Sequence, residues 1–237
     1  LQNSIKWKNL VSLSYMDYIH KDDFINDVID NKIPFNVSAV IHMGACSDTT
    51  EEDMDYLMDN NTNYTKILAE WCAQNKIRFI YASSAATYGN GENGFDDTID
   101  ELHQLVPINR YAYSKHLVDL WANEKGLFDT IVGLKFFNVY GPGESHKEGM
   151  RSLACKAFDQ INETHALQLF KSHHPDYKDG EQKRDFIYVN DCADIVFWFL
   201  ENEHKNGLYN VGTGQAEPWN NVANAMFSAM KQPLNIQ

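Results

Sequence analysis

Tyr111 and Lys115 are the two side chains whose types and spacing best suit acid–base chemistry. An apolar face continues behind them from 117 to 121, which predicts a helix. Residues four apart lie on one helix face, so both side chains point the same way, about 5–6 Å apart. A nearby ammonium group lowers the pKa of a tyrosine, which otherwise titrates near ~10. The pair can therefore move a hydroxyl proton, although this spacing also occurs by chance on half-buried helix faces.

Ser84 is the third candidate, and it lies in an apolar run that begins at Ile80. The run continues into small hydroxyl residues and a Tyr-Gly pair, which predicts a strand that leaves a sheet at its carboxyl end. Open α/β sheets bind their ligands at that edge. Ser84, Tyr111 and Lys115 together resemble the catalytic triad of the extended short-chain dehydrogenase/reductases, which use NAD(P) to modify nucleotide sugars.

The composition limits the class of partner. The 237 residues carry a formal net charge of −13, which disfavours nucleic acid and anionic membranes but leaves small anionic ligands open. No apolar run reaches the ~18 residues of a membrane span. The four cysteines contain no C-x-x-C pair, which is typical of free thiols in a reducing cytosol. We therefore expect a cytoplasmic protein with no nucleic-acid or membrane partner.

A histidine-rich loop is the one place that suggests a metal. His173, His174 and Asp176 are three potential ligands. No fourth ligand follows at the spacing of a metal site, so the pattern favours a solvated loop. We expect no metal.

Predicted strands and helices alternate along the first half of the sequence. Hydrophobic periodicity predicts strands over 9–13, 38–43, 77–81 and 130–137, and helices over 22–30, over 49–74 and from Pro107 past Tyr111. Such alternation is typical of parallel β-α units. The later predicted elements are a helix over 149–161, a strand over 167–170, a helix over 192–200, a strand and turn over 208–214, and a helix with Pro218 at its first position.

The alternation predicts an α/β fold. The resemblance to the extended short-chain dehydrogenase/reductases implies more, a Rossmann-type doubly wound parallel sheet with a smaller C-terminal α/β substrate domain. The expected NADP-binding domain covers 1–141 and is rejoined by about 183–205. The expected substrate-binding domain covers 142–182 and about 206–237.

A dinucleotide fold also needs a glycine-rich turn, because only glycine lets the backbone approach a pyrophosphate. The literal match over 89–94 runs into the acidic stretch 95–100 instead of a helix, which favours a flexible loop. Either the chain is no Rossmann protein or its first β-α-β unit is missing. We expect the second, and we expect the substrate domain to be incomplete at its C-terminus.

Several polar residues near the predicted strand ends are further candidates. The turn over 44–47 could let a cofactor lie across the strand tips, but an ordinary tight turn explains it equally well. The stretch 59–61 lies in a predicted helix, although Asn is a poor helix former. A buried Asn there can hydrogen-bond the backbone of a neighbouring strand or reach a cofactor, and a polar helix face that points to solvent is the alternative. Asn138 can bind a sugar diphosphate or cap a turn.

Two cationic residues complete the candidates. Lys147 lies in a polar loop, where it is either solvated or a second acid–base group across a pocket from Tyr111. Arg184 carries a fork that fits phosphate oxygens. A surface pair between Arg184 and Asp185 explains that motif nearly as well.

The order of the motifs narrows the resemblance. They are His42-x-Gly-Ala-Cys-Ser47, Thr49-Thr-Glu51, Met58-Asp-Asn-Asn61, the stretch 81–89, Tyr111-x-Tyr-Ser-Lys115, Phe137-Asn-Val-Tyr-Gly-Pro142, His146-Lys147 and Lys183-Arg-Asp-Phe186. This set resembles the ADP-heptose 6-epimerases, nucleotide-sugar epimerases of bacterial lipopolysaccharide synthesis, from about Lys6 to about Phe227. The resemblance implies NADP as cofactor (NAD as the alternative), ADP-heptose as substrate and a homo-oligomer.

The resemblance also implies roles for single residues. Tyr111 and Lys147 would be opposed acid–base groups, Ser84 would orient the substrate, and Lys115 would bind the nicotinamide ribose and tune Tyr111. The cofactor-binding set would be Lys6, Lys21, Met43, Gly44, Ala45, Cys46, Ser47, Asn60, Lys115, Val139 and Lys147, with Lys6 and Lys21 suited to a 2′-phosphate. The substrate-binding set would be Ser84, Asn138, Gly149, Lys156, Phe170, Lys171, Ser172, His173 and Arg184. The implied reaction removes hydride from C6″ of the heptose, leaves a ketone, and returns the hydride to the other face.

The sequence departs from the family pattern at Lys156, where a histidine is expected, and at Gly149, where a serine is common. Dehydratases carry an Asp-Glu pair where this chain has Ala85 and Ala86, so dehydration ranks low. A UDP-sugar 4-epimerase, a reductase and a non-catalytic NADP-binding protein or fragment are the alternatives. The complete triad argues against the last, because a binding module needs no proton-transfer group.

Overall fold

The computed structural model describes residues 5–169, 171–172 and 178–237. The chain forms two compact units. The sheet unit, as we call it, consists of Tyr15–Phe136 and Asp194–Val211. The second unit consists of Leu1–Ser14, Phe137–Ala193 and Gly212–Gln237.

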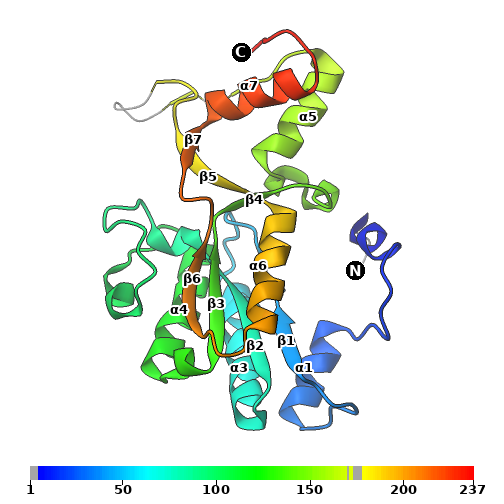
Figure 1. Cartoon of the computed structure of the whole chain (residues 1–237), viewed down its shortest axis with the longest axis vertical. Helices are drawn as coiled ribbons and strands as arrows, with labels where there is room; N and C mark the ends of the chain where they lie inside the picture. Colours follow the sequence, from blue (N-terminus) through cyan, green and yellow to red (C-terminus); the bar gives the residue numbers. More distant parts are fainter. Residues whose placement is uncertain (1–4, 170, 173–177) are drawn as a thin grey trace. The chain divides into compact units, whose positions relative to one another are not determined.

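Parallel strands form the centre of the sheet unit (Figure 1). In spatial order they are β1 (Ala39–His42), β2 (Arg78–Ser84), β3 (Ile131–Phe136) and β6 (Gly207–Val211). All neighbouring pairs among these strands are parallel, which confirms the α/β prediction. The carboxyl ends of β1 and β2 therefore meet at one edge of the sheet, where candidate residues follow each strand.

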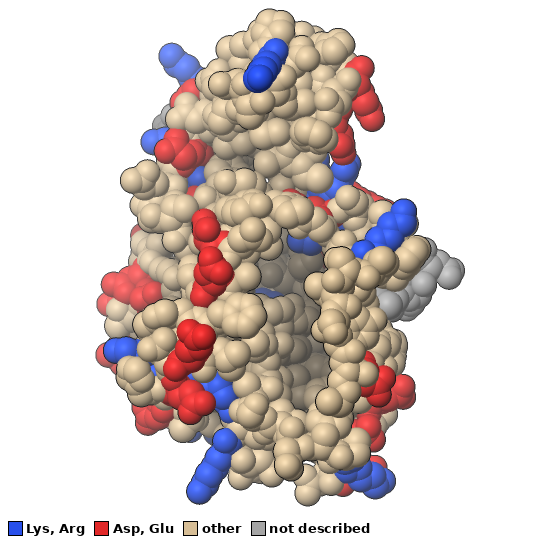
Figure 2. Space-filling model, turned by 45° about the vertical axis from the view of Figure 1, so that its right-hand side comes forward, with Lys and Arg blue, Asp and Glu red and all other residues tan. Residues whose placement is uncertain are grey.

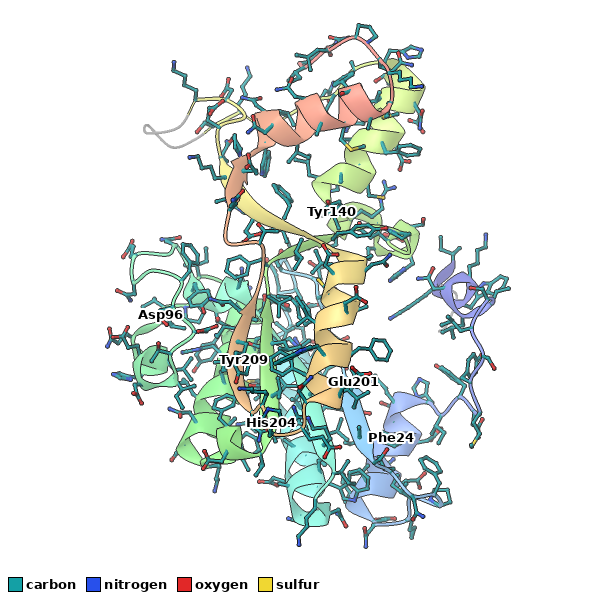
Figure 3. All side chains as sticks on the ribbon, in the orientation of Figure 1. Phe24, Asp96, Tyr140, Glu201, His204 and Tyr209 are labelled. Carbon is teal, nitrogen blue, oxygen red and sulfur yellow. The ribbon has the colours of Figure 1, made fainter. Side chains whose placement is uncertain are left out.

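Helices α1 (Lys21–Ile29), α3 (Tyr64–Asn75) and α4 (Arg110–Glu124) share one core with this sheet. The core joins Leu68 of α3 and Val118 of α4 to Phe79 and Tyr81, alternate residues of β2 that face the same side. Phe24 of α1 packs against its margin (Figure 3). The candidate helix α4 is thus fixed on β2 by buried apolar contacts.

Helix α6 (Val189–Glu201) crosses the boundary between the units. In the part that belongs to the sheet unit, the ring of Phe199 lies 4.8 Å from that of Tyr209 on β6, centroid to centroid. Apolar packing of this kind secures the last strand of the sheet.

The second unit contains β4 (Asn138–Tyr140), β5 (Lys183–Tyr188) and β7 (Ala216–Pro218). Strand β5 pairs in parallel with β4 and antiparallel with β7. Helices α5 (Leu153–Thr164) and α7 (Trp219–Ala229) share a small core made of Ala157, Ile161, Leu167, Ala223 and Phe227.

These units divide the chain differently from the expected domains. The expected domains put 183–205 with the dinucleotide-binding sheet and 206–237 with the substrate domain. Instead β5 pairs with β4 and β7 in the second unit, while β6 pairs with β3, so 194–211 rejoins the sheet unit. Pairing partners decide this division, and periodicity along a sequence carries no information about them.

The predicted strand over 9–13 is wrong. A 3-10 helix covers Ile5–Leu10, and a turn follows in which the Leu13 N–H donates to the Leu10 carbonyl at 3.0 Å. Val11 and Leu13 are exposed. A short apolar run fits several kinds of structure, so periodicity alone could not decide here.

The helix predicted over 49–74 begins later than expected. Asp48 accepts hydrogen bonds from the Thr50 N–H and hydroxyl, which makes a turn there. Asp53 caps α2 (Met54–Leu57) by accepting from the Tyr56 N–H at 2.9 Å. The helix then continues through a π-helical segment, Met58–Asn63, into α3.

Three later elements also differ from their predictions. Helix α5 begins at Leu153 because Ser152 caps it, and Pro218 precedes α7 as its N-cap. The strand predicted over 167–170 is reduced to one bridge between Leu167 and Ile236. Phe170 itself lies outside the described residues.

In the described part of the chain, every helix is too short or too polar to cross a membrane. On the face shown in Figure 2, Lys and Arg side chains lie singly among acidic ones. That pattern agrees with the acidic net charge of the sequence.

Candidate active site

Helix α4 presents Tyr111 in its first turn and Lys115 one turn later. Asn109 caps the helix, and its side chain accepts from the Ala112 N–H at 2.8 Å. Tyr111 is 9% exposed and Lys115 is 3% exposed, so both face the interior. The predicted shared helix face is confirmed.

Ser84 meets these two residues at the carboxyl end of β2. A hydrogen bond joins the side chains of Ser84 and Tyr111. The Lys115 ammonium donates to the Ala82 carbonyl of the same strand at 2.8 Å. The three side chains that the sequence singles out therefore converge at one strand end.

The electrostatics of this trio differ from the sequence-based expectation. Burial raises the pKa of Tyr111, and the hydrogen bond from Ser84 offsets only part of that effect. Burial also lowers the pKa of Lys115 to about 8, against an opposing influence of Asp119. The expected lowering of the Tyr111 pKa by Lys115 is thus wrong in this structure, because desolvation dominates.

A buried ion pair lies behind the trio, and sequence reasoning missed it. Lys135 of β3 and Asp119 of α4 are 2.8 Å apart, and both side chains are fully buried. Asp119 also accepts from the hydroxyls of Tyr81 (2.8 Å) and Ser83 (2.7 Å), while Lys135 donates to Thr87. This network ties α4 to the stretch of β2 that ends at Ser84. A charged residue inside an otherwise apolar strand was the signal that could have found it.

Asn61 fixes the turn that follows β1. Its amide accepts from the Cys46 N–H at 2.8 Å and donates to the Cys46 carbonyl at 3.0 Å. The same side chain donates to the hydroxyl of Ser114, next to Lys115. Asn61 is fully buried and therefore links the candidate cofactor turn to the candidate catalytic helix.

The sequence-based cofactor set names Asn60, the neighbour of Asn61. Asn60 donates to Asn61 and is partly buried. Of the alternatives for the stretch 59–61, Asn61 takes the one in which an asparagine holds a backbone. Thr62, also turned inward, donates to the Ser114 carbonyl at 2.8 Å.

His42, the last residue of β1, supports this turn from the other side. The Thr65 hydroxyl donates to the Asn61 carbonyl, so at 3.0 Å it accepts from His42 Nε2, which must carry the ring proton. Burial lowers the pKa of His42 to about 3, and the Lys115 charge adds to that effect. His42 is therefore neutral at physiological pH.

The other cofactor candidates lie on the surface. Met43 is exposed, and the Gly44–Ser47 turn is partly exposed. Lys21 forms an exposed ion pair with Asp22 at 2.7 Å in the sheet unit. Lys6 is exposed and belongs to the second unit, as does the half-buried Val139.

The described substrate candidates of the second unit fall on its loops and strands and, for Lys156, on helix α5. Asn138 is exposed and its amide donates to the Asp185 carbonyl at 3.1 Å, whereas the exposed Arg184 donates to the Lys183 carbonyl at 2.7 Å. Lys147, Gly149 and Lys171 are exposed, while Lys156 and Ser172 are half-buried. Phe170 and His173 lie outside the described residues, as do His174 and Asp176. Among the described residues, no group of His, Cys, Asp and Glu side chains is arranged to hold a metal ion.

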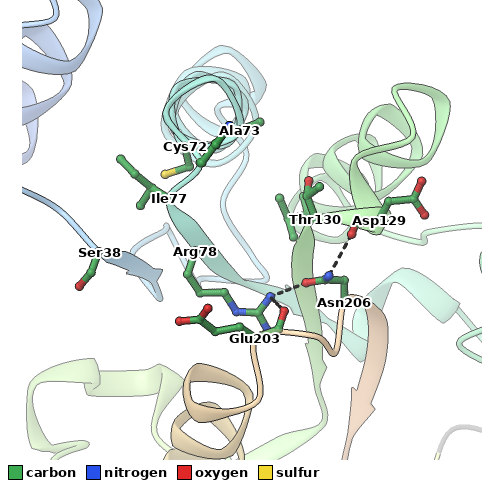
Figure 4. Close-up of a pocket in the computed structure, with 11 residues that line it drawn as sticks. Ser38, Cys72, Ala73, Ile77, Arg78, Asp129, Thr130, Glu203 and Asn206 are labelled. Atoms are coloured by element: carbon green, nitrogen blue, oxygen red, sulfur yellow. Dashed lines mark hydrogen bonds between the residues drawn. The ribbon is translucent and has the colours of Figure 1, made fainter.

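A cavity of about 320 Å³ lies at the amino ends of β2 and β3, the opposite edge of the sheet (Figure 4). Its Arg78 donates to the carbonyls of Phe199 (2.9 Å) and Lys205 (2.7 Å) and to the side chain of Asn206. Arg78 thereby satisfies one carbonyl at the end of α6 and one in the segment that follows it. The cavity surrounds a structural anchor and contains none of the candidate residues.

Comparison with known proteins finds one matching family and several similar proteins that share one name. Residues 5–212 match the model of the NAD dependent epimerase/dehydratase family. An ADP-L-glycero-D-manno-heptose-6-epimerase of Nitratidesulfovibrio vulgaris is 54% identical over 235 residues, which cover 99% of this chain and 73% of that protein. The enzyme of that name from Fusobacterium nucleatum is 46% identical over 239 residues, covering 100% and 72%. A crystal structure of the Helicobacter pylori enzyme superposes with a TM-score of 0.79 at 27% identity, covering 97% of this chain and 69% of that one.

Proposed function

This chain belongs to the NAD dependent epimerase/dehydratase family, and from that premise we propose that it epimerises ADP-glycero-manno-heptose at C6″ with NADP as its cofactor. The observation that carries the proposal is the 54% identity, over almost the whole chain, to a relative named for that reaction. The convergence of Ser84, Tyr111 and Lys115 at one strand end supports it with a site suited to proton transfer.

The residues around the turn after β1 fit a dinucleotide. Gly44 to Ser47 are small, the turn lies at the carboxyl edge of the sheet, and Asn61 fixes it on both sides of Cys46. Met43, the turn and Asn60 would line the cofactor there, and Val139 and Lys147 complete the proposed cofactor-binding set. The bound nicotinamide would accept a hydride from C6″ and return it to the opposite face.

The chain's own side chains would handle the protons. Tyr111 would take the hydroxyl proton as C6″ becomes a ketone and give it back on one face, while Lys147 would serve the other face. Ser84 would hydrogen-bond the reacting oxygen through the hydroxyl that contacts Tyr111. Lys115 would hold the nicotinamide ribose, and its low pKa makes its ammonium a ready proton donor near neutral pH.

Residues of the second unit would bind the ADP-heptose. An exposed Arg184 offers a bidentate fork to the diphosphate. Asn138, Gly149, Lys156, Phe170, Lys171, Ser172 and His173 would complete the set. The resemblance assigns Lys6 and Lys21 to the end of the cofactor that carries the 2′-phosphate in NADP, a group that needs positive charge nearby.

We further propose a cytoplasmic homo-oligomer. The four cysteines are free thiols, which suits a reducing compartment.

The proposed function is tested by offering the protein each C6″ epimer of ADP-heptose with NADP and following the reaction by NMR. Each epimer should yield the other until both are present. UDP-glucose is the matched control for a 4-epimerase. Conversion of UDP-glucose with no change in ADP-heptose would overturn the proposal.

A further inference from the structure

The buried carboxylate of Glu144 binds both ends of the loop that carries Lys147. Glu144 is 6% exposed. One of its oxygens, Oε1, accepts from the Gly141 N–H at 3.0 Å and from the Ser152 hydroxyl at 2.7 Å. The other, Oε2, accepts from the Ser152 N–H at 2.6 Å. Both ends of the loop are thus bound to the same side chain, by charge-assisted hydrogen bonds that are stronger than neutral ones.

Each end of this loop is also anchored to regular structure. Gly141 follows β4 directly and has a φ of +143°, and a Cβ there would lie 2.5 Å from a side-chain carbon of Val189, so only glycine fits. Ser152 caps α5, and its hydroxyl accepts from the Cys155 N–H at 3.2 Å while it donates to Glu144. Glu144 therefore fixes the loop relative to a strand and a helix.

The main-chain carbonyl of Glu144 holds the backbone of Lys147, and the Lys147 ammonium group is left available. The Lys147 N–H donates to the Glu144 carbonyl at 2.9 Å. The Lys147 side chain is exposed, and the structure gives it no hydrogen bond or ion pair to any residue that it describes. Asn9 steadies the same loop from outside by donating to the Gly143 carbonyl at 2.9 Å.

We propose that Glu144 is the positioning residue for the second acid–base group: its carboxylate sets the conformation of the loop that presents Lys147. This inference rests on the proposed function, in which Lys147 serves one face of the ketone. Proton transfer needs donor and acceptor within hydrogen-bond reach, and a shift of about 1 Å can cost about 100-fold in rate. If the two ends of the loop were not held by Glu144, Lys147 would rarely lie within hydrogen-bond reach of the reacting oxygen.

The test compares Glu144→Gln with Glu148→Gln, a matched substitution of an exposed carboxylate in the same loop. Glutamine has the size of glutamate, but an NH₂ group replaces one of the two carboxylate oxygens. That group cannot accept a hydrogen bond from Gly141 or Ser152. We expect kcat for epimerisation to fall about 10- to 100-fold with a smaller change in KM. Reduction of an aldehyde analogue at C6″, which needs proton transfer on the Tyr111 face alone, should keep its rate. Glu148→Gln should change neither rate.

A double variant separates positioning from general support. If Glu144 acts through Lys147, adding Glu144→Gln to Lys147→Ala should cause no further loss of epimerisation. A further loss in that background, or an equal loss in the aldehyde reaction, would overturn the inference. Ser152→Gly gives a milder version, because glycine keeps most of the helix cap and removes only the hydroxyl donor. It should lower kcat in the same direction, and an unchanged kcat would count against the inference.

Hydrogen exchange followed by mass spectrometry tests the geometry without activity. Amides over 145–150 should exchange faster in Glu144→Gln than in the unmutated protein or in Glu148→Gln. Equal exchange would contradict the role of Glu144 in the loop. Failure of the proposed function would look different, because the unmutated protein would then leave ADP-heptose unchanged. Epimerisation by Lys147→Ala at the unmutated rate would instead contradict the role of Lys147, and with it this inference.

Discussion

At the scale of single residues, the interior charges of the sheet unit matter most. Lys135 and Asp119 have no exposed side-chain surface, yet their charged atoms lie 2.8 Å apart and have hydroxyl partners. Burying a pair of this kind costs desolvation energy, which offsets the attraction between the two charges. Removal of one partner is strongly destabilising, because the other charge then stays buried without a counter-charge.

We expect Lys135→Met to lower the free energy of unfolding by about 3–5 kcal/mol, because it leaves the Asp119 charge buried without its partner. Lys125→Met, at an exposed position at the end of α4, is the control and should change stability by under about 0.5 kcal/mol. Urea unfolding measures both. A loss below about 1 kcal/mol for Lys135→Met would show that the pair is not buried as described.

His42 should make the protein sensitive to acid. Its pKa is lowered from 6.5 to about 3 in the folded state, so the unfolded chain binds the proton more readily. The stability that this group contributes is therefore complete above about pH 6.5 and is lost as the pH falls toward about 3. Between about pH 7 and pH 5, His42 alone should account for a loss of about 2 kcal/mol.

The variant His42→Gln should remove that part of the pH dependence, whatever its effect on stability at neutral pH. His103→Gln, at an exposed histidine, is the matched control and should leave the pH dependence as it is. Urea unfolding at the two pH values gives the comparison. The same slope in His42→Gln and in the unmutated protein would refute the assignment.

At the scale of elements, the π-helical segment Met58–Asn63 joins the turn after β1 to α4. Asn61→Ala should leave the Cys46 N–H and carbonyl without partners and cost roughly 2–3 kcal/mol. It should also weaken NADP binding, because the turn loses the contacts that shape it. Asn63→Ala, which removes only an exposed contact with Asp59, is the control. Titration calorimetry measures the affinity of each variant for NADP. Equal affinities would contradict the role of Asn61 in shaping the turn.

The loop element that carries Lys147 contains a strained residue. Glu148 has φ 47° and ψ −119°, a conformation that favours glycine. Glu148→Gly should raise the free energy of unfolding by about 1 kcal/mol, because relief of strain outweighs the entropy that glycine adds to the unfolded chain. Glu148→Ala keeps the Cβ and should give no such gain. A glycine variant less stable than the alanine variant would rule out the strain.

At the scale of the whole molecule, the parallel sheet and its helices could be predicted because β-α alternation leaves a clear periodic signal. The assignment of β5 and β6 to the two units could not, since it depends on pairing between distant segments. The Asp119–Lys135 pair could not be predicted for the same reason, because its two residues come from different elements. Which residue of the stretch 59–61 holds the turn could not be predicted either, because one π-turn breaks the 3.6-residue period.

The convergence of Ser84, Tyr111 and Lys115 was predictable for a simpler reason. Helical spacing places Tyr111 and Lys115 on one face, and the fold rule for strand ends places Ser84 at the ligand edge. The pKa of Tyr111 was not predictable, because burial depends on packing that the sequence does not reveal. The roles of the second unit's residues are still proposals at this scale.

The central claim is that the hydride removed from C6″ returns to the same carbon within one turnover. ADP-heptose that carries deuterium at C6″ tests it directly when the reaction runs in ordinary water and the inverted product is analysed by NMR and mass spectrometry. The account predicts that the inverted product keeps its deuterium at C6″. Inversion with loss of the deuterium to solvent would mean that C6″ loses a proton instead of a hydride, and it would contradict the account.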